Sequence, residues 1–224
     1  MATRIMRHHV GAGAGAKRFA VVGQLADENS SFVRHVGLLN RDVSDLRDSF
    51  GVPASHMVPP IEASGEIRAD LIGELNDLSV GEVNRMGLWL EEKVGDCSPR
   101  GLRAYIAVPH FCDGVKDEVT GVPRGSRFSC IGFVIECYRY GTRSDLISTE
   151  ESDLPQVPRP EIDFIYGEYA EPLRKYIGIG GGGPFPIVLP GYFFHALNRD
   201  DKACRKDKYK PQRPDSHFPH PASK

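Results

Sequence analysis

Cys130 is the residue whose type and position could most directly do chemistry. Ser129 is a candidate N-cap for a helix over CIGFVIECYRY, which would place Cys130 in the first helical turn. Unpaired N–H groups and the helix dipole favour an anion there, lower a thiol pKa and can stabilise an acyl oxyanion. Cysteine is also among the most buried residue types, and Cys137, two turns later, fits that structural role. Cys130 is therefore a candidate nucleophile, with Ser129 and Ile131 as candidate binding residues beside it.

A thiol nucleophile needs a base, and the base needs a third group that holds its tautomer. The sequence offers eight histidines as possible bases. Four of them lie near the chain ends, and four lie in or beside predicted elements: His35, His56, His110 and His195. Composition and spacing alone do not choose among these four.

Two other motifs could bind ligands. His110-x-Cys112-Asp113 supplies possible zinc ligands, but the CxxC or HxxxH partner of a zinc site is missing, so we interpret it as a loop. The run GIGGGGPFP, over residues 178–186, lacks the Lys-Ser/Thr of a phosphate loop and fits a sharp, mobile connection. We therefore predict neither a metal nor a cofactor.

The elements that must position Cys130 begin with strands. β-Branched and aromatic residues predict strands over 18–23 and 34–39, and Pro59-Pro60 keep the segment 56–63 extended. A short helix is expected over 42–50, and apolar residues at helical spacing predict another over 67–78. A capping box of Ser79 with Glu82 opens the best-defined helix, Ser79 to Val94, with Gly95 as its stop.

The second half of the chain is less regular. Residues 103–108 resemble a strand, and the Cys130 helix is apolar nearly all round, which predicts that it is buried; Gly141 is its expected stop. Residues 155–190 hold seven prolines and the glycine run, so we expect irregular structure with one strand near 162–166. Residues 143–198 could form an arm or a lid, anchored by the aromatic stretch YFFHAL.

Composition indicates one α+β domain of 224 residues in a reducing compartment. The net charge of −2 does not favour nucleic acid or an acidic membrane, although residues 199–224 carry +4 and the rest −6. Five cysteines without CxxC spacing do not form a disulfide framework. No apolar run approaches the ~20 residues that span a bilayer, and MATRIMRHHVGAGAGA is unlike a signal peptide. We expect a cytoplasmic protein with a flexible leader at 1–17 and a disordered basic tail at 199–224.

Three short patches carry a resemblance to a known superfamily. The segment FSCIGFVIECYRYGT resembles the nucleophile helix of the lecithin:retinol acyltransferase-like proteins, where an Asn-Cys pair opens a helix that ends Arg-Tyr-Gly. RHVGLL is similar to the histidine strand of the same circularly permuted, papain-like (NlpC-type) superfamily. PPIEASG resembles the strand that follows it in the YiiX-type branch. The resemblance covers roughly Arg18 to Thr142 in the order of its elements.

The resemblance implies roles for named residues. Cys130 would be the nucleophile, His35 the base and Glu62 the carboxylate that orients His35, with His56 as the alternative orienting group. Three features depart from the family pattern: Ser129 replaces the usual Asn, Ile131-Gly132 replaces a polar pair, and Pro59-Pro60 interrupt the Glu62 strand.

These observations predict a papain-like α+β fold over residues 18–198, with a small antiparallel sheet packed against the Cys130 helix. The expected function is a cysteine-dependent hydrolase or acyltransferase that acts on a small-molecule or peptide-like amide or ester through a thioester. A non-catalytic binding protein that retains the fold is the alternative, and a metal enzyme using His110 and Cys112 is a third hypothesis. The oligomeric state is left open.

Overall fold

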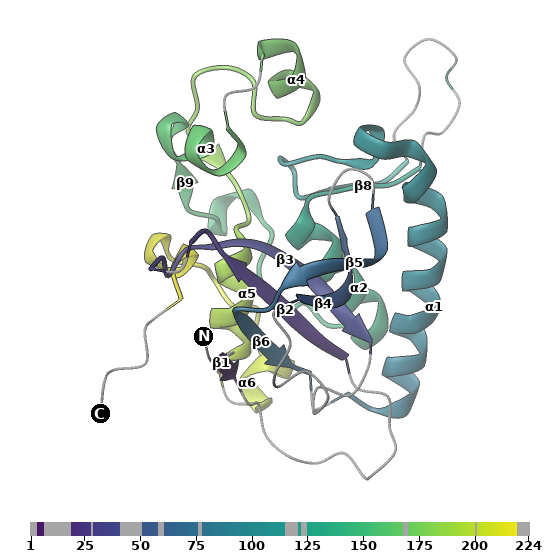
Figure 1. The fold of residues 1–224 in the computed structure, drawn as a ribbon. Coiled ribbons are helices and arrows are strands. Elements are labelled where there is room, and N and C mark those ends of the chain that lie inside the picture. The colour runs from purple at the N-terminus through teal and green to yellow at the C-terminus, as the bar shows by residue number, and fades with distance from the viewer. Residues whose placement is uncertain are drawn as a thin grey trace.

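The protein is a mixed α+β structure built round one curled sheet (Figure 1). The computed structural model describes residues 4–6, 19–27, 29–40, 51–57, 61–75, 78–114, 121, 125–167, 170–199 and 201–218. The sheet order is β1-β6-β2-β3-β4-β5, with β1 parallel to β6 and the other five strands antiparallel. These strands are β1 (Arg4–Met6), β2 (Phe19–Leu25), β3 (Val33–Asn40), β4 (Gly51–Met57), β5 (Ile61–Arg68) and β6 (Leu71–Glu74).

Helices and short ladders fill the rest of the described chain. The helices are α1 (Val80–Cys97), α2 (Cys130–Thr142), α3 (Arg159–Tyr166), α4 (Glu171–Tyr176), α5 (Pro190–Leu197) and α6 (Asp201–Lys206). The 3₁₀ turns are η2 (Ser98–Ala104), η3 (Glu151–Asp153) and η4 (Arg213–Ser216). Two small antiparallel ladders join β7 (Phe111–Cys112) to β8 (Arg127–Phe128), and β9 (Gln156–Val157) to β10 (Phe185–Pro186).

The strands predicted over 18–23 and 34–39 are confirmed as β2 and β3. The helix predicted over 67–78 is wrong, because this segment ends β5 and forms β6. Ile67 and Ile72 pack in one apolar cluster of the sheet, and Leu71 and Leu75 pack in the other. Strands buried on both faces thus carry apolar residues at spacings that imitate a helix. The short helix expected over 42–50 lies outside the described residues.

The capped helix predicted at Ser79 is confirmed as α1. The Ser79 hydroxyl accepts the Glu82 N–H, and the Glu82 carboxylate accepts the Ser79 N–H at 2.7 Å. The helix continues past Gly95, where no other group lies within 4 Å of the Cβ position, and ends at Cys97. The strand expected over 103–108 is wrong, because η2 extends to Ala104 and the Ala107 N–H bonds the Ile177 carbonyl.

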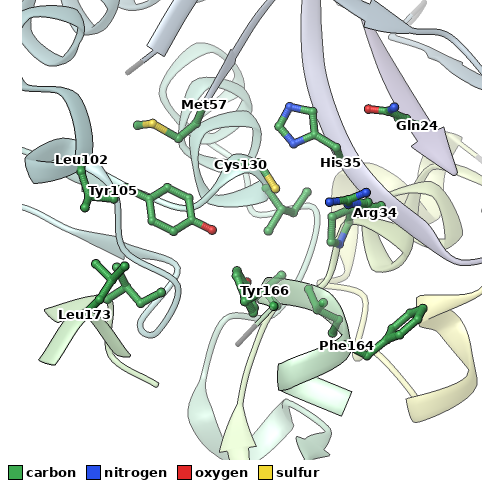
Figure 2. A pocket seen from close by; sticks show the side chains of 16 residues that line it. Gln24, Arg34, His35, Met57, Leu102, Tyr105, Cys130, Phe164, Tyr166 and Leu173 are labelled. Carbon is green, nitrogen blue, oxygen red and sulfur yellow. The ribbon is translucent and has the colours of Figure 1, made fainter. Parts of the chain in front are cut away.

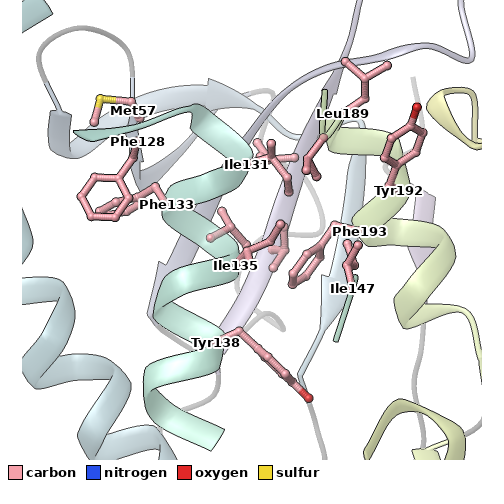
Figure 3. Close-up of a cluster of buried hydrophobic side chains, with 14 of the residues drawn as sticks. Met57, Phe128, Ile131, Phe133, Ile135, Tyr138, Ile147, Leu189, Tyr192 and Phe193 are labelled. Carbon is pink, nitrogen blue, oxygen red and sulfur yellow. The ribbon is translucent and has the colours of Figure 1, made fainter. Parts of the chain in front are cut away.

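Buried aromatic and branched side chains fix α2 and α5 against the sheet (Figure 3). The aromatic stretch predicted to anchor an arm is α5, in which Tyr192, Phe193 and Phe194 are fully buried. A Cβ at Gly23 would lie 2.7 Å from the Phe194 ring, so the absence of a side chain there lets α5 approach β2. In this part of the predicted arm, the chain forms core rather than a lid.

Segment 159–166 is helical rather than the strand predicted near 162–166. Pro160 stands at the start of α3, and Arg159 pairs with Asp163 one helical turn later, at 3.0 Å. A proline in the first turn and an i,i+4 ion pair both favour a helix at this point. Figure 1 shows α3 and α4 together at one end of the molecule, away from α1.

The C-terminal segment from Asp201 to Phe218 is not the disordered tail that its composition predicts. It forms α6 and η4, and it buries Cys204 and Phe218. Its residue His217 forms an antiparallel β-bridge with Phe32. Its cations pair with acids spread over the rest of the domain: Arg205 with Glu82, Lys208 with Asp145, Lys210 with Asp153 and Arg213 with Glu161. Basic side chains of this segment therefore pair with acidic side chains elsewhere in the protein. Composition alone does not reveal these pairs.

Gly141 gives a direct test of the α1–α2 packing. The sequence predicts that Gly141 ends α2, yet the helix ends one residue later, at Thr142. The C-cap residue is Arg143, in the left-handed conformation. A Cβ at Gly141 would lie 2.1 Å from the Met86 side chain. We expect Gly141→Ala to lower the free energy of unfolding by about 1–3 kcal/mol in urea titrations, because overpacking a core contact is destabilising.

Gly87→Ala is the matched control, because its Cβ position in α1 has no neighbour within 4 Å. That variant should gain up to about 1 kcal/mol from helix propensity. Equal effects of the two substitutions would contradict the close packing of α1 on α2.

Candidate active site

The start of α2 holds Cys130 in the first helical turn, as the sequence predicts. Ser129 is extended, and its hydroxyl accepts the Gly132 N–H at 2.9 Å. The Ser129 N–H in turn donates to the His110 carbonyl at 2.9 Å, which ties the cap to the preceding loop. The N-terminus of α2 is thus fixed on both sides of the cap.

Gly132, in the first turn of α2, lies directly against the preceding loop. A Cβ at this position would lie 1.9 Å from the His110 carbonyl oxygen. The loop before β7 therefore packs directly on the backbone of the first helical turn, and any larger residue would push the turn away. Packing therefore requires glycine at this position.

Water exclusion dominates the electrostatics of the Cys130 thiol. Burial raises its pKa to about 11, although N–H groups of Ile131, Val36 and Cys130 itself hydrogen-bond the sulfur and pull the pKa down. The expectation that the helix N-terminus lowers this pKa below that of free cysteine is therefore wrong for the resting protein. Cys137, buried with no such donors, has its pKa raised further, as the sequence predicts.

His35 lies in β3 opposite Gln24, and its ring meets a second histidine. His35 Nε2 lies 2.8 Å from His56 Nδ1, and the two rings pack edge to face. Gly37 permits this contact, since a Cβ there would be 3.0 Å from the His56 Cβ. Burial, His56 and Arg34, in that order, lower the His35 pKa to about 4, so the imidazole is neutral at pH 7.

Cys130 and His35 line the same cleft (Figure 2). The Val36 N–H of β3 hydrogen-bonds the Cys130 sulfur. That amide belongs to the peptide bond that follows His35, which places the sulfur against the backbone next to the predicted base. The structure thus gathers a neutral thiol, a neutral imidazole and helix N–H donors in one cleft, where Cys130 is partly buried.

Glu62 has a defined register position but no described side chain. In the β4–β5 ladder it stands opposite His56 rather than next to His35. Its role as the orienting carboxylate stays a prediction. The group that contacts His35 Nε2 is His56, which sequence analysis gave as the alternative.

The cleft has a volume of about 860 Å³, and α3 and α4 form part of its wall. The sequence did not predict these wall residues, because the pattern near 162–166 favoured a strand in place of α3. Two features of the sequence indicate a helix here: the proline at its start and the i,i+4 spacing of Arg159 and Asp163. The wall residues that α3, α4 and the two loops after them contribute are Phe164, Ile165, Tyr166, Gly167, Leu173 and Ile177.

The other predicted binding residues have mixed outcomes. Ile131 lines the cleft, whereas Ser129 is buried as the cap. His195 Nε2 lies 3.0 Å from the His217 carbonyl, and His110 Nε2 lies 3.6 Å from Glu136. In the described ranges, no three His, Cys, Asp or Glu side chains form a group that could hold a metal.

The glycine run is a structural connection in this fold. Gly178 has a φ of 84°, and a Cβ there would lie 1.7 Å from the Val108 carbonyl oxygen. The Gly181 N–H donates to Glu171, and its carbonyl accepts from Arg159. The run thus joins α4 to β10 and packs against Val108, in the segment before β7.

In comparisons with known proteins, no family model, curated protein or solved structure matches the chain. Among the described helices, none is both long enough and apolar enough to cross a membrane.

The raised pKa of Cys130 predicts its reactivity. At pH 7 iodoacetamide should modify Cys130 about one to two orders of magnitude more slowly than free cysteine, because little thiolate is present. The rate should still be rising at pH 10. Peptide mass spectrometry after short pulses measures it, with Cys130→Ser identifying the peptide. A rate that levels off below pH 8 would instead show a thiolate stabilised in the resting protein.

Proposed function

We propose that the protein is a cysteine-dependent hydrolase or acyltransferase, with Cys130 as nucleophile and His35 as base. The observation that carries this proposal is the meeting of the Cys130 sulfur, at the start of α2, with the β3 backbone beside His35 in one cleft. A papain-like fold is part of the proposal. A nucleophile helix against an antiparallel sheet that carries the histidine, with histidine before cysteine in the chain, supports it.

The protonation states define how the reaction would begin. Both partners are neutral at pH 7, so the thiol loses its proton to His35 as the sulfur attacks the carbonyl carbon, rather than beforehand. This requires the tautomer in which His35 Nε2–H donates to His56 Nδ1, which leaves His35 Nδ1 as the acceptor. The N–H groups of Cys130 and Ile131, which already bond the sulfur, would stabilise the developing oxyanion.

The remaining steps return the proton. The His35 imidazolium donates it to the leaving amine or alcohol, and a thioester forms on Cys130. Water or another acceptor, deprotonated by His35, then resolves the thioester. The proposed partner is accordingly a small-molecule or peptide-like amide or ester.

A binding protein is the second candidate, and the high pKa of Cys130 favours it. A thiol that burial keeps protonated gives up reactivity, while the apolar cleft could still hold a ligand. The two candidates differ in whether any turnover depends on Cys130.

Turnover of activated esters tests the catalytic proposal. Hydrolysis of phenyl octanoate should vanish in Cys130→Ala and fall about 10²–10⁴-fold in His35→Ala. His35 must be neutral to act as base, so kcat/KM should hold down to about pH 5 and fall as pH drops through about 4. His195→Ala, outside the cleft, should retain activity. Unchanged hydrolysis in Cys130→Ala would leave the binding protein as the better description.

His56 can be tested as a positioning residue. His56→Ala should lower kcat/KM about 10–100-fold, because His35 loses the contact that holds its tautomer. It should also move the acid limb of the pH profile upward, since His56 lowers the His35 pKa. His56→Asn, which retains an acceptor, should recover part of the rate. If Glu62→Gln reproduces the loss and His56→Ala does not, Glu62 is the orienting group.

A further inference from the structure

The cleft has two chemically different halves on either side of Cys130. Figure 2 shows Met57, Leu102, Tyr105 and Leu173 on one side of the sulfur, and Gln24, His35 and Arg34 on the other. The first half offers aliphatic and aromatic surface. The second half offers an amide, an imidazole and a guanidinium, with the Phe164 ring below Arg34 in the same view. A substrate that fills both halves must itself be apolar at one end and polar at the other.

The chemistry of the site orients such a substrate. His35 gives its proton to the leaving group, so the leaving group must lie on the His35 side of the scissile bond. The acyl group then extends from the carbonyl carbon in the opposite direction, into the half formed by Met57, Leu102, Tyr105 and Leu173. The leaving group then lies on the side of the cleft that Gln24 and Arg34 line.

Arg34 supplies a positive charge where the leaving group would lie. Its side chain is exposed at the rim of the cleft, and within the described ranges it forms no ion pair with a carboxylate. Its charge reaches His35, whose pKa it helps to lower. Gln24 faces Arg34's neighbour His35 across the β2–β3 ladder, so both polar groups belong to the same end of the sheet. Guanidinium groups bind carboxylates through paired hydrogen bonds.

We propose, on the basis of the hydrolase function above, that the substrate is an ester or amide joining an apolar acyl group to a carboxylate-bearing alcohol or amine. The cleft volume of about 860 Å³ is within the ~300–1,000 Å³ typical of pockets that enclose drug-sized molecules. It therefore accommodates a medium-length acyl chain together with a compact anionic leaving group.

The bond changes balance with water as the co-reactant. The carbonyl carbon gains a bond to the Cys130 sulfur and loses its bond to the leaving oxygen or nitrogen. The thiol proton passes through His35 to that leaving atom, and the carboxylate stays with the departing alcohol or amine. Water then releases the apolar acid from the thioester.

A matched pair of esters tests the assignment. Phenyl octanoate and 4-carboxyphenyl octanoate share the acyl group and differ by one carboxylate on the leaving group. We expect kcat/KM at pH 7.5 to favour the carboxylated ester about tenfold over the neutral one, after correction for their hydrolysis rates without enzyme. At this pH His35 is neutral with or without Arg34, so the ratio reports binding of the anion.

Two variants distinguish charge recognition from general damage. Arg34→Gln should lower the ratio of kcat/KM between the carboxylated and the neutral ester to about one. Arg103→Gln, which removes an exposed cation that does not line the cleft, should keep the preference. Leu173→Asp should slow both octanoyl esters but spare the corresponding acetyl esters.

The outcomes separate this proposal from the function on which it rests. Absence of Cys130-dependent hydrolysis of either ester would overturn the hydrolase function itself. Cys130-dependent hydrolysis with the same ester ratio in wild type and Arg34→Gln would retain the function and overturn the carboxylate assignment. Faster turnover of acetyl than of octanoyl esters would overturn the apolar half of the proposal.

Discussion

Burial of α2 is the constraint on which the rest of the structure depends. Ile131, Phe133, Val134 and Ile135 are all within the core, and the helix packs between α1, α5 and the sheet. Because side chains interlock on nearly every side, the helix cannot slide or turn without opening cavities. Two close backbone approaches, at Gly132 and Gly141, fix its two ends. The position of the Cys130 sulfur against β3 follows from this packing.

The same burial determines the protonation states of the candidate site. It holds Cys130 and His35 in place, but it also removes the water that would stabilise a thiolate or an imidazolium. The donors that compensate an anion are already present as backbone N–H groups. In the resting site both Cys130 and His35 are neutral. Charge would develop only as the sulfur attacks a carbonyl carbon, when the N–H groups would hydrogen-bond the carbonyl oxygen.

Long-range charge pairing joins the C-terminal segment to the domain. The segment reaches α1 through Arg205 and Glu82, and the Glu82 carboxylate also belongs to the α1 capping box. Each exposed pair contributes little alone. Together with the buried Phe218 and the backbone pairing of Phe32 with His217, the pairs order a stretch with few large apolar residues. Its η4 turn also packs on α5, whose first residue, Pro190, lines the cleft.

The sequence by itself determined the elements whose signals are local. The Ser79 and Ser129 caps, the β2 and β3 strands and the burial of α2 all follow from residues within a few positions of one another, and the structure has them. Local signals also placed Cys130 in a first helical turn. They failed for β6, where burial on both faces places apolar residues at helical spacing. They also failed for α3, because seven prolines over residues 155–190 predicted irregular structure although Pro160 stands at the start of a helix.

Only the tertiary structure decided the partners and the charges. The contact between His35 and His56, the N–H that Val36 lends to the Cys130 sulfur and the ion pairs of the C-terminal segment join residues that lie far apart in the chain. The direction of the Cys130 pKa shift reversed for the same reason. A helix terminus is visible in sequence, whereas the exclusion of water from it depends on every element packed around it.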